Sequence, residues 1–154
     1  MQQFSLRRLL LRAKAPRDRR NHPRKRPRYG TSILIVDDSK TILFALKKML
    51  EQNGYHVHGA SHGQDAIEQA AQHRPALILM DVIMPVMNGF RACRILSNNE
   101  ETRDIPIIMM SGDEQAMQQF WVNKIGAVDF LNKPFNRADV FQKLEQYLPH
   151  AMVA

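Results

Sequence analysis

Between residues 32 and 148, short apolar segments alternate with stretches of helical periodicity. We expect five of these segments to form strands, at 33–36, 55–59, 76–80, 105–110 and 127–131. Each is followed by a stretch that we expect to be helical, at 40–52, 64–73, 88–98, 113–124 and 136–148. Strict alternation predicts parallel strands, because the chain must cross back to the same edge of a sheet before each new strand. The pattern therefore predicts one α/β domain.

The composition of the expected strands separates central from edge positions. The first, third and fourth are apolar on both faces, as strands covered by helices on both sides must be. The second and fifth mix polar with apolar residues and fit the edges. With right-handed crossovers, these strands predict an open five-stranded parallel sheet with helices on both faces.

Reactive side chains stand at the ends of four of these strands. Asp37 and Asp38 follow the first strand, Asp81 the third, Ser111 the fourth, and Lys133 comes just after the fifth. In a parallel sheet the carboxyl ends of all strands lie at one edge, where ligands bind. We therefore expect three carboxylates, a hydroxyl and an ammonium group to converge there.

These groups favour phosphoryl transfer to a carboxylate. Three adjacent carboxylates repel one another unless a cation lies among them, and a few oxygen ligands suit Mg²⁺. Lys133 would neutralise a phosphoryl group while a carboxylate attacks the phosphorus in line. A flavin phosphate site is disfavoured, because Asp37 and Asp38 would repel a phosphate at the first loop.

Four sequence segments together resemble a known family. They read ILIVDDS, LILMDVIMPVMNG, PIIMMSG and FLNKPF, in this order. The set is similar to the receiver domains of two-component response regulators, over roughly residues 32–148. The resemblance implies a flavodoxin-like (βα)5 fold with strand order 2-1-3-4-5. It departs from the family at Asn88, where Asp is frequent, but Asn caps a helix equally well.

The resemblance assigns roles to the residues around the expected site. Asp81 is implied to be the phosphoacceptor, with Mg²⁺ held by Asp37, Asp38, Asp81 and the backbone carbonyl of Ile83. Ser111 is implied to contact the phosphoryl group as the switch hydroxyl.

Two further roles follow from the same resemblance. Lys133 would contact the phosphoryl group from the opposite side and precede a cis bond to Pro134. Phe130 occupies the switch-aromatic position and would turn inward after phosphorylation. The surface of the fourth helix, fifth strand and fifth helix would then change for partner binding.

The implied partners are a sensor histidine kinase or phosphotransfer protein and a downstream protein effector. Because only six residues follow the last expected helix, we expect a stand-alone regulator without an output domain. FWVNKIG at 120–126 and MPVMNGF at 84–90 are similar to small regulators of twitching motility by type IV pili, which suggests pilus or chemotaxis control.

Net charge divides the chain into unequal parts. Residues 1–30 hold 11 Lys and Arg against one acidic residue, whereas the remainder has a balance of −3. We expect 1–30 to be a basic disordered tail, 31–150 a receiver domain and 151–154 a C-terminal tail. A targeting leader or an upstream start codon chosen in error also fits 1–30. Nucleic-acid binding is expected only through this tail, and no segment is expected to enter a membrane.

Other features leave alternatives open. A single cysteine, Cys93, excludes an internal disulfide, and a reducing, cytoplasmic location is the simplest interpretation.

A phosphatase-like enzyme with an aspartyl nucleophile is one alternative function. Such an enzyme usually carries a second Asp two residues after the nucleophile, and Ile83 at that position counts against it. His56, His58 and His62 could bind a metal, but histidines at alternate strand positions more often form a solvated face. A DNA-binding regulator that uses the basic tail is the remaining alternative.

Overall fold

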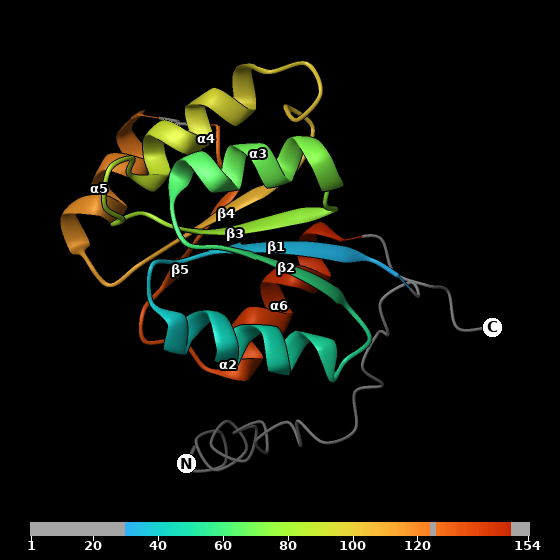
Figure 1. Cartoon of the computed structure of the whole chain (residues 1–154). Coiled ribbons are helices and arrows are strands. Elements are labelled where there is room, and N and C mark those ends of the chain that lie inside the picture. Colours follow the sequence, from blue (N-terminus) through green and yellow to red (C-terminus); the bar gives the residue numbers. More distant parts are fainter. Residues whose placement is uncertain (1–29, 124–125, 149–154) are drawn as a thin grey trace, which may run out of the picture.

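The computed structural model describes residues 30–123 and 126–148, which form a parallel sheet covered by helices (Figure 1). The five strands are arranged in the order β2-β1-β3-β4-β5. Their bounds are Ser32–Val36 for β1, His56–Ala60 for β2, Leu77–Asp81 for β3, Ile107–Ser111 for β4 and Asp129–Asn132 for β5. The predicted fold class and strand order are therefore confirmed.

In the described residues, four helices connect the strands and a fifth follows β5, and together they cover both faces of the sheet (Figure 1). They are α2 (Lys40–Glu51), α3 (Gly63–His73), α4 (Gly89–Asn98), α5 (Glu114–Asn123) and α6 (Arg137–Tyr147). Buried residues of α3, α4 and α5 pack into one hydrophobic cluster, and those of α2 and α6 pack into a second. Successive residues of the central strands belong alternately to the two clusters, so Leu34 lies in the first and Ile35 in the second. This two-sided burial explains why the central strands are apolar throughout.

The fourth strand begins later than its apolar run suggests. The expected start at Ile105 is wrong, because Ile105 donates its N–H to the Thr102 carbonyl in a turn, at 3.1 Å. Pro106 has no N–H to donate to a ladder, and its carbonyl accepts from Ile78 at 3.0 Å. The regular strand therefore begins at Ile107 and extends to Ser111.

Side-chain caps fix where three helices begin. Asn88 Oδ1 accepts from the N–H of Arg91 at 2.9 Å, which confirms the predicted cap of α4. Ser39 caps α2 in the same way, and Asn136 forms a reciprocal capping box with Asp139 at the start of α6. These caps matter for function because all three helices begin at the edge of the sheet where the strands end.

Parts of the predicted domain division lie outside the described residues. The residues outside the description are 1–29, 124–125 and 149–154. They include nearly all of the expected basic tail. Within residues 30–123 and 126–148, no helix has the length and apolar character needed to cross a bilayer.

Candidate functional site

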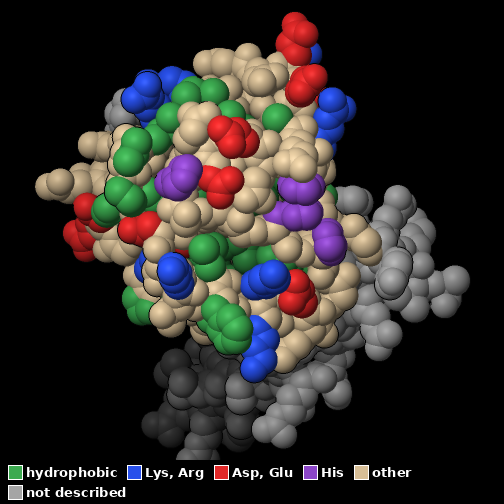
Figure 2. Space-filling view, viewed as in Figure 1, with side chains coloured by type: hydrophobic (Ala, Val, Ile, Leu, Met, Phe, Trp, Pro, Cys, Tyr) green, Lys and Arg blue, Asp and Glu red, His purple; other side chains and the backbone are tan. Residues whose placement is uncertain are grey.

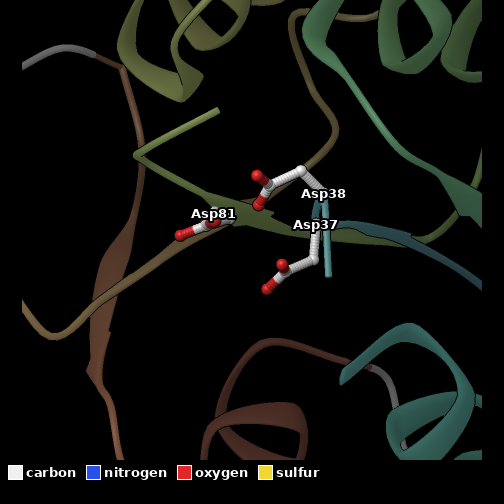
Figure 3. A group of neighbouring side chains, drawn as sticks. All are labelled: Asp37, Asp38 and Asp81. Atoms are coloured by element: carbon white, nitrogen blue, oxygen red, sulfur yellow. The ribbon is translucent and has the colours of Figure 1, made fainter. Parts of the chain in front are cut away.

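Three carboxylates meet where β1 and β3 end (Figure 3). Asp37 and Asp38 follow β1 directly, and Asp81 is the last residue of β3. One oxygen from each carboxylate lies within 4.8 Å of the others. Asp37 and Asp81 are buried, with exposed fractions of 1% and 5%, whereas Asp38 is open to solvent. The predicted convergence of these three side chains is confirmed as geometry.

The ammonium group of Lys133 lies between two of the carboxylates. Its Nζ is 2.7 Å from Asp37 Oδ2 and 3.4 Å from Asp81 Oδ1. Lys133 follows β5, and its backbone N–H donates to the carbonyl of Ser111 at 2.9 Å, which holds it beside the site. The predicted cis bond between Lys133 and Pro134 is present. Asp37 is the nearer partner of Lys133, which the sequence did not indicate.

The Asp81 carboxyl is poorly suited to carry a charge without a further cation. Burial raises its pKa most, and the Asp37 and Asp38 carboxylates raise it further. Lys133 lowers the pKa through its charge and hydrogen bond but does not cancel the rise, so the pKa reaches about 6. The site therefore favours an additional cation close to Asp81.

Ser111 ends β4 at the same edge and is buried, with 2% of its surface exposed. Its Oγ accepts a hydrogen bond from the N–H of Asp113 at 3.0 Å, which orients the hydroxyl at the start of the loop to α5. The register pairs Asp81 with Met110 and Ser111 with Asn132. Neighbouring strands therefore bring Asp81, Ser111 and Lys133 to one end of the sheet, as predicted.

The loop after Asp81 and the first residue of α4 each have a feature that sequence reasoning missed. A Cβ at Gly89 would lie 2.1 Å from the backbone oxygen of Asp81, so only glycine fits there. Val86 has a φ of 69°, which is unusual for a β-branched residue, and Met87 donates its N–H to Pro85 across it at 2.8 Å. A glycine at the first position of a helix is a sequence signal for such a close approach. No sequence pattern indicates the positive φ of Val86.

Phe130 lies in β5 and is buried. Its ring centroid is 5.4 Å from that of Phe120 on α5, and Phe120 also contacts Trp121 edge-on at 4.8 Å. The buried ring already has the inward position that the resemblance assigns to the phosphorylated form. Exchange of Phe130 between two positions remains a prediction. Trp121 itself is exposed, so it is available to a partner rather than packed in the core.

Other candidate residues have separate roles. Cys93 is buried on α4, and burial raises the pKa of its thiol to about 11, as expected of a packing residue. His62 caps α3 through Nδ1, which accepts from the N–H of Asp65 at 3.1 Å. His62 is therefore not part of a group with His56 and His58.

Comparisons with known proteins agree with this geometry. Residues 33–145 match the family model described as the response regulator receiver domain. Protein PilH of Pseudomonas aeruginosa is 39% identical over 116 residues, which cover 75% of this chain and 96% of PilH. Protein PilG of the same organism is 28% identical and is covered over 89% of its length.

Two solved structures are similar in both sequence and fold. The Vibrio cholerae chemotaxis response regulator CheY4 is 30% identical with a TM-score of 0.71, over 77% of this chain and 99% of CheY4. The receiver domain of the Pseudomonas aeruginosa sensor histidine kinase PA1611 is 32% identical with a TM-score of 0.70, over 77% of this chain and 97% of that one. The PA1611 structure is described with a magnesium ion coordinated in its active-site cleft.

Proposed function

The chain belongs to the family of response regulator receiver domains, and from this membership we propose that Asp81 accepts a phosphoryl group from a histidine kinase or phosphotransfer protein. Receiver domains are signalling switches of two-component phosphorelays rather than turnover enzymes. The observation that carries the proposal is the buried Asp81 carboxylate, which lies beside two further carboxylates and 3.4 Å from the Lys133 ammonium.

The donor set fits Mg²⁺. Carboxylate oxygens of Asp37, Asp38 and Asp81 lie close enough to share one ion. Burial raises the pKa of Asp81 most, and the negative charges of Asp37 and Asp38 raise it further. The carbonyl of Ile83, in the loop after β3, is the fourth proposed ligand. A bound Mg²⁺ would neutralise this charge and polarise a phosphoryl oxygen.

The residues of this chain support an in-line transfer. A carboxylate oxygen of Asp81 attacks phosphorus, forming a phosphorus–oxygen bond while the phosphorus–nitrogen bond of the donor phosphohistidine breaks. The electron pair of that bond returns to the donor imidazole. Lys133 balances charge on the phosphoryl oxygens, and the Ser111 hydroxyl donates a hydrogen bond to one of them. Hydrolysis by water would return Asp81 to its free form.

We propose that the output surface is formed by α5, β5 and α6. Phe120 and Phe130 pack against each other beneath it, and Trp121 and Val128 are exposed on it. A change at Ser111 would reach this surface through β4, which pairs with β5. A downstream protein effector would bind the altered surface. The similarity to PilH and PilG favours control of pilus motility or chemotaxis, and we propose a cytoplasmic location.

Labelling with a small phosphodonor tests the proposal. With acetyl phosphate and Mg²⁺, the native chain is expected to gain one acid-stable, base-labile phosphoryl group, because an acyl phosphate resists acid better than base. Asp81→Asn should remove the label, since an amide oxygen cannot form an acyl phosphate. Asp104→Asn, at an exposed aspartate outside the site, is the control and should be labelled like the native chain. Equal labelling of Asp81→Asn and the native chain would overturn the assignment.

A second prediction concerns stability without divalent cations. The pKa of Asp81 is raised in the folded chain from 3.8 to about 6, so the carboxyl destabilises the fold above about pH 6 and not below about pH 4. Asp81→Asn removes this penalty, which corresponds to at most about 3 kcal/mol. We therefore expect the variant to be more stable than the native chain at neutral pH in chelator, with the difference vanishing at low pH.

Urea unfolding at neutral pH and below about pH 4 measures the difference in stability between Asp81→Asn and the native chain. Adding Mg²⁺ at neutral pH should stabilise the native chain more than Asp81→Asn, because the ion binds only the folded site. A variant less stable than the native chain in chelator at neutral pH would show that burial and the neighbouring carboxylates do not penalise the charged Asp81 as the structure indicates.

A further inference from the structure

Three histidines gather on the edge strand β2 and the end of α3, far along the sheet from the acidic site. Figure 2 shows histidine side chains clustered at one end of the visible face, apart from another histidine. The rings of His56 and His58 lie 4.8 Å apart, edge to face, and those of His58 and His73 lie 3.8 Å apart, stacked within 10°. His73, which is distant in sequence, therefore forms one cluster with His56 and His58.

The backbone brings the three histidines to the same face of the sheet. His56 and His58 are two residues apart on β2, so both side chains leave the same face of the strand, about 7 Å apart. The register pairs His56 with Ser32 and His58 with Leu34 of β1. His73 is the last residue of α3, the helix that packs on this face of β2.

The ring nitrogens are available to a ligand. Among the described residues, no hydrogen bond engages the rings of His56, His58 or His73, in contrast with His62, which caps a helix. Burial and the nearby charges of His73, His56 and Lys47 lower the pKa of His58, which favours its neutral form. Neutral imidazole is the form that binds a metal.

We propose that His56, His58 and His73 form a binding site for Zn²⁺. Three imidazole nitrogens with remaining positions open to water suit this ion, whereas Mg²⁺ prefers oxygen ligands. The stacked rings of His58 and His73 must turn about their side-chain torsions to direct their nitrogens at one ion. His73 is exposed and His58 is half-buried, so the His73 ring can turn without displacing a core residue. The ion would join the edge strand to α3.

The site is separate from the phosphoacceptor. β2 reaches the acidic edge at Ala60, which pairs with Val36, whereas His56 lies at the opposite end of the strand. Zn²⁺ binding at the histidines therefore does not require the carboxylates, and excess Mg²⁺ can be used to occupy them during the test.

Calorimetric titration of Zn²⁺ into the full chain in excess Mg²⁺ tests the proposal. We expect saturable binding of one ion per chain, and a loss of affinity of about tenfold or more in His58→Gln and in His73→Gln. His62→Asn, which keeps a capping oxygen, should bind like the native chain. The two ligand variants sit on different elements, so a folding defect in one does not remove the test.

A second readout is the unfolding temperature. Zn²⁺ should raise it for the native chain and His62→Asn but not for His58→Gln, because the joined elements exist only in the folded state. Native-like Zn²⁺ affinity in both His58→Gln and His73→Gln would overturn the proposal, since the ion would then be held by other groups of the chain. Absence of saturable binding to the native chain would overturn it as well.

Discussion

Gly89→Ala is expected to destabilise the chain by about 3 kcal/mol or more, a large share of the stability of an ordinary domain. The added Cβ would lie 2.1 Å from the backbone oxygen of Asp81, and 2.9 Å from the methyl group of Met109. The helix cannot relieve this clash by moving a side chain, because its first residue is anchored by the Gly89 N–H to the Val82 carbonyl at 2.8 Å. Urea unfolding measures the loss.

Gly59→Ala, in β2, provides the control for the added methyl group. No atom lies within 4 Å of a Cβ placed at Gly59, and its backbone is compatible with alanine. We expect this variant to unfold at a urea concentration close to that of the native chain. If Gly89→Ala were as stable as Gly59→Ala, the close approach of α4 to the end of β3 would be wrong, and so would the position assigned to Asp81.

Lys133→Met is expected to slow phosphorylation by a small phosphodonor by about 100-fold, as loss of a donor to a developing anion typically does. Methionine keeps most of the unbranched side chain but removes the charge that lies 3.4 Å from Asp81 Oδ1. Mg²⁺ affinity should not fall, because the lost cation stood among the carboxylates that hold the ion. The rate of labelling and the Mg²⁺ affinity together distinguish an effect on the phosphoryl group from one on the metal.

Lys47→Met is the control for this change. Lys47 is exposed on α2 and pairs only weakly with Glu51, at 3.9 Å. Its variant should be labelled at the native rate. A native rate for Lys133→Met would exclude Lys133 from the transfer step, whereas slow labelling with weakened Mg²⁺ binding would assign it to the metal site instead.

The parallel sheet and the convergence of Asp37, Asp81, Ser111 and Lys133 could be predicted because they depend on one-dimensional patterns, whereas the strand order was implied by the resemblance to receiver domains. Apolar runs reveal the buried strands, and parallel strands bring their ends to a common edge. Strand limits were less predictable. Ile105 is as apolar as its neighbours, and only the hydrogen bonds around Pro106 show that the ladder begins after it.

Several contacts of the site depend on distances that no sequence pattern encodes. The approach of Gly89 to the Asp81 backbone and the preference of Lys133 for Asp37 emerge only when β3, α4 and β5 are packed together. The stacking of His73 on His58 likewise joins residues from two elements. The alternate spacing of His56 and His58 was visible, but the third ring was not, and His62 proved to be a helix cap.

The most direct test of the central claim is to locate the phosphoryl group. Borohydride reduction of the phosphorylated full chain converts an aspartyl phosphate to homoserine, which peptide mass spectrometry assigns to a position. We expect homoserine in place of Asp81, dependent on both phosphodonor and Mg²⁺. Homoserine in place of Asp37 or Asp38, or a borohydride-resistant phosphoester on Ser111, would contradict it.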